Sequence, residues 1–151
     1  MLGTIAMDLL NWLCAWPGLI TKIDAKMIGR MAVGWTRGRF CYSHPSEMDP
    51  ASSEFLIGLC THYAIGLAFA AFYVLGWELL VGGAASAVGA LVYGVGTTAA
   101  SWFFVYPVMG LGIFGLRSPD GMKAAYSSLA NHLFFGIGMA AAVAIVNTLV
   151  I

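Results

Sequence analysis

The sequence predicts an all-α membrane protein with four transmembrane helices. Hydrophobic residues make up 60% of the chain and charged residues only 9%, whereas soluble domains carry roughly 25% charged residues. A helix that crosses the hydrocarbon core of a bilayer needs about 20 mostly apolar residues. Four segments meet that requirement, at residues 1–20, 55–77, 84–106 and 124–150. The whole chain, 1–151, then forms a single transmembrane domain.

The first apolar segment is predicted to remain as a helix and not to be removed as a signal peptide. No Lys or Arg precedes the apolar run from Met1, and no small-x-small cleavage site follows it. We therefore count this segment as the first of the four spans.

Between the first two spans, residues 21–35 form an amphipathic pattern. Apolar residues recur at helical spacing from Ile23 to Trp35, and basic residues occupy the opposite side. This predicts one helix lying on the membrane surface with its basic side toward anionic lipid headgroups. A connecting helix packed on the bundle explains the pattern equally well. The basic residues of this loop are Lys22, Lys26, Arg30, Arg37 and Arg39.

The distribution of basic residues predicts the orientation in the membrane. All seven Lys and Arg residues lie in two loops, 21–54 and 107–123. The loop between the second and third spans has one charged residue, Glu78, and no Lys or Arg. Cytoplasmic loops are the ones enriched in Lys and Arg, so both loops are expected in the cytoplasm and both termini on the periplasmic or outer side. The formal net charge is zero, which gives no indication of a nucleic-acid partner.

An internal repeat is indicated by two alignments. Residues 58–71 align with 128–141, so that His62 matches His132, and residues 11–17 align with 101–107. The spans therefore read as two parallel two-helix repeats, an arrangement known in transporters. Chance similarity between apolar helices is the alternative.

Several polar residues are predicted to lie inside the bilayer, where ionisable groups are costly and require an explanation. Both histidines fall roughly 10 to 12 Å from the cytoplasmic boundary, and the other polar residues lie on single faces of the first and third spans. We expect them to form one buried polar site. The predicted members are Asp8, Asn11, His62, Thr98, Ser101 and His132.

Three interpretations of this site remain open. It is a hydrogen-bonded core that fixes the register of the helices, or a transport or proton-relay site, since His changes charge near neutral pH. Alternatively, His62 and His132 ligate haem axially, or bind a transition metal together with Cys14 or Cys60. No cofactor is firmly implied by the residues.

No enzyme is expected, because no GxSxG, HExxH or Walker motif occurs. The cysteines Cys14, Cys41 and Cys60 include no CxxC pair. All three lie in or near the predicted cytoplasmic half, where disulfides are not expected. The apolar, Gly-rich stretch 107–116 is too short to span and reads as a re-entrant or an interfacial loop.

The sequence also resembles a bacterial inner-membrane family known as domain of unknown function 2938. The resemblance covers nearly the whole chain, although the first segment is several residues shorter than in that family. It implies an inner-membrane location and adds no reaction. The residues that carry it are Met7-Asp8, Gly29-Arg30, Gly38-Arg39-Phe40, His62-Tyr63, Gly66, Pro107, Gly110, Gly112, Arg117-Ser118-Pro119, Ser128-Leu129, His132 and Gly136.

The leading functional interpretation is a small transporter or channel-like protein with a buried Asp/His site. A chain of this size is expected to form a homo-oligomer or to join a larger complex within the lipid bilayer. A non-catalytic accessory subunit of such a complex is the first alternative. A haem- or metal-binding membrane protein is the second.

Overall fold

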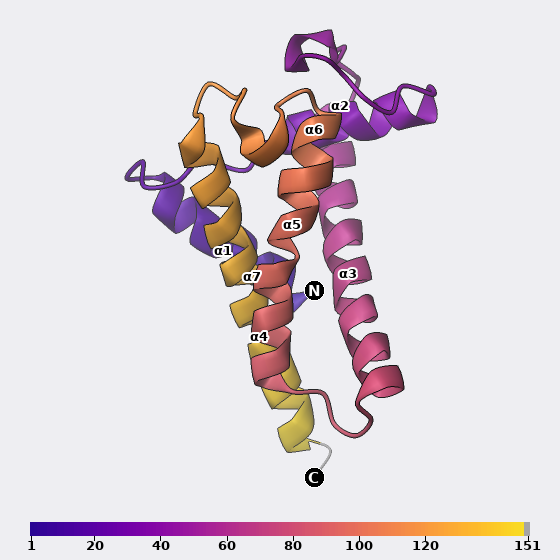
Figure 1. The fold of residues 1–151 in the computed structure, drawn as a ribbon, viewed down its shortest axis with the longest axis vertical. Helices are drawn as coiled ribbons and strands as arrows, with labels where there is room; N and C mark the ends of the chain where they lie inside the picture. Colours follow the sequence, from indigo (N-terminus) through magenta and orange to yellow (C-terminus); the bar gives the residue numbers. More distant parts are fainter. Residues whose placement is uncertain (150–151) are drawn as a thin grey trace.

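The computed structural model describes residues 1–149, which form helices and loops and contain no strand (Figure 1). The long helices are α1 (Leu2–Ala15), α2 (Ala25–Thr36), α3 (Glu54–Leu80), α4 (Ala87–Gly96) and α7 (Met122–Leu149). Three short pieces follow α4 after the single turn residue Thr97: α5 (Thr98–Ala100), the π-helical η2 (Ser101–Val105) and α6 (Tyr106–Val108). Two 3₁₀ turns, η1 (Pro45–Glu47) and η3 (Ile113–Gly115), lie in loops.

Within residues 1–149, three helices are long and apolar enough to cross a membrane. They are α3, the run from Ala87 to Val108 and α7. They correspond to the predicted segments 55–77, 84–106 and 124–150, although residue 150 lies outside the described residues. The prediction of an all-α protein is therefore confirmed for these residues, and three of the four predicted spans are helices that could cross a membrane.

Helix α1 is shorter than the predicted segment 1–20, since it ends at Ala15. Trp16 keeps helical dihedral angles, and the chain turns away at Gly18, whose φ is +78° and after which the N–H of Leu19 bonds to the carbonyl of Cys14. Fourteen residues measure roughly 21 Å along a helix axis, which is less than the hydrocarbon thickness of about 30 Å. The first residue of α1 lies about halfway along α7 (Figure 1).

Helix α7 lies between α1 and α4, and glycines make both contacts close. A Cβ atom added at Gly136 would lie 2.7 Å from the carbonyl oxygen of Leu91 in α4. One added at Gly138 would lie 2.6 Å from the carbonyl oxygen of Leu2 in α1. Small residues at these crossings let the backbones approach, as is common between helices in membranes.

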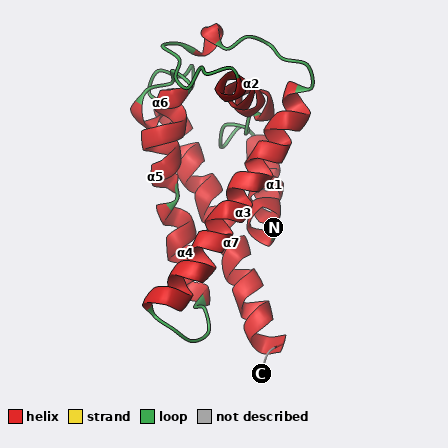
Figure 2. Ribbon diagram, turned by 90° about the vertical axis from the view of Figure 1, so that its right-hand side faces the viewer, coloured by secondary structure: helices red, strands yellow, loops and turns green. Residues whose placement is uncertain are grey.

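The loops after α1, α2 and α6 gather at one end of the molecule, which we call the loop end (Figure 1). Helix α2 lies across this end and crosses α3 (Figures 1 and 2). Asp24 caps its N-terminus by accepting from the backbone N–H groups of Lys26 and Met27. At the crossing, Gly58 of α3 faces the carbonyl of Ala25, with no room for a Cβ. The amphipathic segment predicted at residues 21–35 is thus a helix over Ala25–Thr36 that packs on the bundle.

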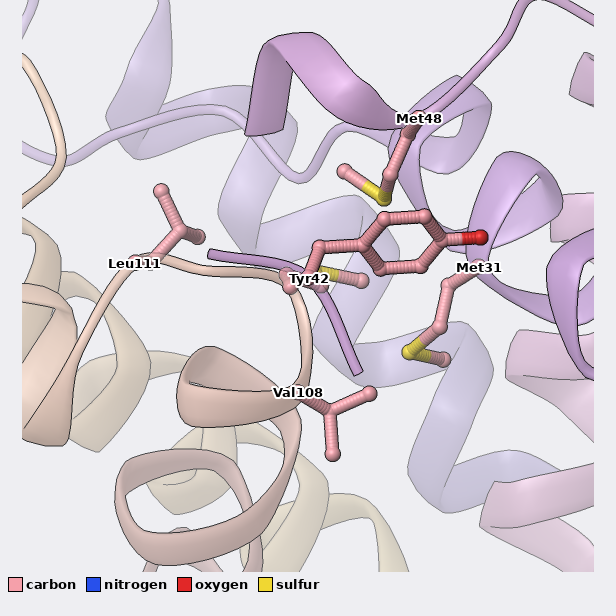
Figure 3. Close-up of a cluster of buried hydrophobic side chains, with 6 residues drawn as sticks. Met31, Tyr42, Met48, Val108 and Leu111 are labelled. Atoms are coloured by element: carbon pink, nitrogen blue, oxygen red, sulfur yellow. The ribbon is translucent and has the colours of Figure 1, made fainter. Parts of the chain in front are cut away.

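The loops after α2 and α6 meet at the same end of the molecule and share a buried cluster (Figure 3). Tyr42 packs within it, and its backbone N–H donates to the carbonyl of Val108 over 2.9 Å. The apolar stretch 107–116 is therefore covered by protein where it forms this cluster. The buried members are Met31, Tyr42, Met48, Val108, Met109 and Leu111.

A second buried cluster lies between the helices farther from the loops. Its members are Met7, Tyr73, Ala90, Phe135 and Met139, with Phe69 packed against them. The rings of Phe69 and Phe135 lie 6.5 Å apart. Side chains of this cluster fill the space between α1, α3, α4 and α7.

Candidate functional site

A cavity of about 410 Å³ lies between the two buried clusters. Its walls come from α1, α3, the α5–α6 run and α7, and α2 and the adjoining loops contribute the rest. Both His62 and His132 line it. The volume falls in the range of pockets that bind small molecules. The structure therefore brings the two predicted histidines, from different helices, to one cavity.

His62 pairs with Asp8 at one side of this cavity. Its Nε2 atom lies 2.9 Å from Oδ1 of Asp8, and the two side chains are 16% and 32% exposed. An ionised carboxylate only accepts hydrogen bonds, so Nε2 of His62 carries the proton that is shared. The pair joins α3 to α1, and Lys22 lines a small adjoining pocket with both residues.

His132 is held by hydroxyl groups at both ring nitrogens. Nδ1 lies 2.8 Å from Oγ1 of Thr97, and Nε2 lies 2.9 Å from Oγ of Ser101. The Thr97 hydroxyl donates its one hydrogen to the carbonyl of Gly94, so it accepts from His132. Nδ1 of His132 is therefore the protonated nitrogen, and Ser101 donates to Nε2 when the ring is neutral.

Thr98, which was predicted in the site, points elsewhere. Its hydroxyl donates to the carbonyl of Val95 in its own helix over 2.6 Å, and it does not line the cavity. Its neighbour Thr97 contacts His132 instead. Adjacent residues of a helix point about 100° apart, and nothing in the sequence Thr97-Thr98 shows which of the two faces α7.

Asn11 connects α1 to α7 and to the chain that follows α1. Its Nδ2 donates to Oδ1 of Asn131 over 2.9 Å and to the carbonyl of Thr21 over 3.1 Å. Its Oδ1 accepts from the backbone N–H of Ile23 at 3.3 Å. All three groups lie at the wall of the cavity. Asn131, next to His132 in sequence, was not predicted as a site residue.

Residues 21–24 run along the cavity, and hydrogen bonds join them to α7 and to the turn before it. The backbone N–H of Thr21 donates to Oγ of Ser127 over 2.7 Å, and its hydroxyl donates to Oδ2 of Asp120 over 2.9 Å. We call residues 21–24 the strap. Sequence reasoning missed Ser127 and Asp120, although Ser127 and Asn131 share one face of α7 by their four-residue spacing.

Two hydroxyl groups in the cavity wall lack partners within the described part of the chain. Thr4 is 1% exposed, and its Oγ1 makes no hydrogen bond. Oγ of Ser118, at the other end of the cavity, also makes none. Buried polar groups are nearly always paired with protein or with ordered water. Thr4 Oγ1 packs directly against Gly66, which leaves no room there for a Cβ atom.

The basic residues of the first loop differ in their surroundings. Arg30 forms two hydrogen bonds with the carboxylate of Glu54, at 2.7 and 3.0 Å, which hold the pKa of its guanidinium above its usual range. Arg39 lies 3.5 Å from the carboxylate of Glu47 and over the ring of Tyr42. Among the basic residues of this loop that the structure describes, Lys22, Lys26 and Arg37 are exposed and form no ion pair.

Cys14 and Cys60, the cysteines considered as metal ligands, are not brought to the histidines. Among residues 1–149, no group of three His, Cys, Asp or Glu side chains is placed to hold a metal ion. Cys14 and Cys60 are free thiols and do not line the cavity, so they do not complete a site with the histidines. Ligation by His132 would also require the loss of a hydrogen bond to Thr97 or Ser101.

In the part of the chain that the structure describes, the fold is all-α, with three helices long and apolar enough to cross a membrane and, between the helices, a mostly apolar cavity that carries a few polar groups. The chain belongs to the family described as protein of unknown function DUF2938, whose model matches residues 1–146. This confirms the family resemblance seen in the sequence. No curated protein and no solved structure matches the chain.

Proposed function

We propose that this protein is a small membrane transporter whose cargo, a small solute, ion or proton, passes through the cavity between its helices. The observation that carries this proposal is that His62 and His132, from two different spans, line one cavity of about 410 Å³. Ionisable groups at this depth in a membrane are energetically costly, and their presence there is therefore a sign of function.

The shape of the cavity supports a transport site that is accessible from one side. It extends from Phe69 and Phe135 in the middle of the bundle to the strap and Ser118–Asp120 at the loop end. Beyond the two phenylalanines, the second buried cluster closes the space between the helices. A central site that is blocked on one side is what alternating access requires of each end state.

Within the site, His62 is the group best placed to accept a proton. Its Nε2–H is bonded to Asp8, so a proton would add at Nδ1, and the carboxylate would stabilise the resulting positive charge. His132 differs, because protonation at Nε2 would require the Ser101 hydroxyl to turn from donor to acceptor. We propose that His62 exchanges protons and that His132 orients the cargo.

We further propose that the protein lies in a bacterial inner membrane with both basic loops in the cytoplasm and both termini outside. The structure supports this because the loops that carry the basic residues gather at one end of the molecule (Figure 1). Helix α1 would be a fourth apolar helix in the bilayer, since it packs against α7 at Gly138.

A two-repeat organisation is also part of this proposal. The aligned histidines His62 and His132 both line the cavity, as pseudo-symmetry mates would. Their partners differ, since His62 faces a carboxylate and His132 faces two hydroxyls. We infer that the two halves have specialised, one for charge and one for neutral hydrogen bonding.

Proton flux into vesicles tests this function. The purified protein would be reconstituted with a pH-sensitive dye inside, and a pH gradient imposed together with a potassium ionophore. We expect the wild type to dissipate the gradient and His62→Gln to lose that flux, whereas His44→Gln, in the exposed loop, keeps it. Wild-type vesicles that behave like empty ones would contradict proton exchange through His62.

A second candidate is an accessory subunit or homo-oligomer in a larger membrane complex. One observation favours it: only 11% of the apolar window of α3 is buried, against 33% for α7. Side chains such as Phe72, Leu75 and Leu79 are more than half exposed on this helix. Native mass spectrometry from a mild detergent would give the number and identity of the chains bound there.

A further inference from the structure

The side-chain amide of Asn131 keeps a hydrogen-bond donor without a partner. Its Oδ1 accepts from Nδ2 of Asn11. The orientation of Asn11 is fixed, because its Nδ2 also donates to the carbonyl of Thr21 and its Oδ1 accepts from the N–H of Ile23. Asn131 must therefore offer its oxygen to Asn11, which leaves its Nδ2 as the free group. Within the described residues this Nδ2 makes no hydrogen bond, although Asn131 is only 8% exposed.

The free donor of Asn131 lies on the cavity side of the residue. Asn131 lines the cavity, whereas Asn11, which binds its oxygen, does not. The unpaired hydroxyls of Thr4 and Ser118 are enclosed by protein atoms, and Nδ2 of Asn131 is not among such enclosed atoms. Buried N–H groups are nearly always paired, so a molecule that fills this space is expected to bring an acceptor.

The surroundings of Asn131 favour a neutral acceptor over a carboxylate. Its neighbour His132 is bonded to hydroxyl groups at both ring nitrogens and offers no positive charge. The charged residues that line the cavity are Lys22, Asp24 and Asp120, and all three are exposed. The two carboxylates offset the one ammonium group. A carboxylate buried beside Asn131 would thus lack a cation to pair with, which is strongly unfavourable.

The rest of the cavity wall requires an apolar body. Most of its lining comes from apolar side chains, among them Met7, Met27, Ile65, Phe69 and Phe135. A strongly hydrated solute such as a sugar would leave its hydroxyl groups unpaired against these walls, which is costly. Cavities of this kind bind apolar molecules that carry a few polar groups.

A smaller pocket beside the cavity gives such a molecule a route from the bilayer. It measures about 150 Å³ and lies between α1 and α3, and Lys22, Ile23 and His62 line both this pocket and the cavity. Trp12 and Phe55, at the wall of the smaller pocket, are 51% and 57% exposed. A molecule dissolved in lipid therefore reaches this pocket from the side of the bundle, next to the cavity.

We propose that the cavity binds a lipid-soluble molecule whose polar head is a neutral carbonyl group. The Nδ2–H of Asn131 donates to the carbonyl oxygen, and the apolar body lies along the methionine and phenylalanine side chains of the wall. This inference rests on the proposed function and names the class of its cargo.

NMR of the asparagine side chains tests this contact directly. The asparagines of the sequence are Asn11, Asn131 and Asn147, and it contains no glutamine, so labelling asparagine with nitrogen-15 gives few side-chain amide signals. The full-length protein is studied in lipid nanodiscs, and loss of a signal in Asn131→Leu assigns it. We expect the ketone benzylacetone to shift the Asn131 signals. Those of Asn147, which donates to the carbonyl of Ala85, should stay unchanged.

A matched series of probes tests the chemistry of the head group. Benzylacetone, butylbenzene, hydrocinnamate and the amine that corresponds to the ketone share one phenylethyl body and differ in the head. Binding is measured by calorimetry with empty nanodiscs subtracted, and each probe concentration is expressed per lipid. We expect the ketone to bind roughly 3- to 10-fold more tightly than butylbenzene, the range of a single hydrogen bond. The anion and the cation should bind least. Duroquinone and methyl hydrocinnamate then compare a quinone with an ester as the source of the carbonyl.

Two variants test the position of the head group. Asn131→Leu removes the donor and leaves an apolar side chain of similar size, while Asn11 keeps its bonds to Thr21 and Ile23. We expect this variant to bind the ketone no more tightly than butylbenzene. Asn147→Leu, the same change near the end of α7, is the matched control and should keep the preference for the ketone.

The inference is overturned if benzylacetone leaves the Asn131 signals unchanged, if the carboxylate or the amine binds as tightly as the ketone, or if Asn131→Leu keeps the preference for the ketone. Proton flux measured on the same preparation separates the two proposals. Intact flux without ketone binding removes the carbonyl ligand and leaves the transporter. Ketone binding without flux retains the ligand site and removes proton exchange.

Discussion

The Nε2 atom of His62 lies 2.9 Å from Oδ1 of Asp8, and this contact joins α3 to α1 at the edge of the cavity. The two residues are separated by 54 positions in the sequence. Helix α3 has few other contacts with α1, since its own close crossing is with α2 at Gly58. The pair therefore contributes both to the site and to the position of α3 within the bundle.

We predict that Asp8 and His62 are energetically coupled. In a double-mutant cycle with Asp8→Asn and His62→Gln, the coupling free energy of unfolding is expected to be about 0.6 kcal/mol, the average for hydrogen bonds between membrane helices. Both side chains are partly exposed, and this exposure limits the coupling free energy. Unfolding in mixed micelles measures it. The combination of Asp8→Asn with His44→Gln serves as the control and should be additive.

We predict that His132 is a neutral imidazole with its proton on Nδ1. This follows because the hydrogen of the Thr97 hydroxyl is committed to Gly94, which leaves Thr97 as an acceptor. Nitrogen-15 NMR of histidine-labelled protein distinguishes the two tautomers. In Thr97→Val the preference for Nδ1–H should disappear, whereas Thr98→Val, one residue away, should leave the spectrum unchanged. A wild-type signal from an Nε2–H ring would refute the assignment.

The sequence allowed the class and much of the site to be predicted, because burial in lipid leaves strong signals. Polar residues are so costly there that His62, His132 and Asp8 stand out in the sequence, and in the structure Asp8 lies 2.9 Å from His62. Ser101 was likewise expected near the histidines and lies 2.9 Å from His132.

The details that escaped prediction depend on local backbone geometry. Thr97 and Thr98 lie four and three residues before Ser101, and both spacings place a residue on the same face of a helix, so helical spacing could not decide between them. The strap was missed because Thr21 bonds through its backbone N–H to Ser127, and backbone partners leave no pattern in side chains. The end of α1 at Ala15 was missed because apolar residues continue beyond Pro17.

We predict that Gly58 is required for the crossing of α2 and α3. A Cβ atom at this position would overlap the carbonyl group of Ala25, which is backbone and cannot rotate away. Gly58→Ala should lower the free energy of unfolding by about 1 to 3 kcal/mol, as overpacking does. Gly76→Ala in the same helix meets nothing within 4 Å, and should change stability by less than about 1 kcal/mol. Equal effects would contradict the close crossing.

We predict that the strap is protected from exchange with solvent although it lies outside the helices. The amide hydrogens of Thr21 and Ile23 are bonded to Ser127 and Asn11. In hydrogen–deuterium exchange they should be slow in the wild type, and Ser127→Ala should accelerate exchange at Thr21 by roughly 10-fold, the value of one hydrogen bond. Ser46→Ala, in the exposed loop, is the control. Rapid exchange at both amides in the wild type would show that the strap is not held.

We predict that the loop after α2 and the loop after α3 lie on opposite sides of the membrane. The first contains the exposed Cys41 and the second the exposed Ala84. Two variants that each keep a single cysteine are compared, one at position 84 (Ala84→Cys, without Cys14, Cys41 and Cys60) and one at Cys41 (without Cys14 and Cys60). A membrane-impermeant maleimide added to intact spheroplasts should label the cysteine at position 84. It should label Cys41 only after permeabilisation, because the basic residues around Cys41 keep that loop in the cytoplasm. Labelling of Cys41 in intact spheroplasts would invert the orientation, and with it the side from which the cavity takes up its cargo.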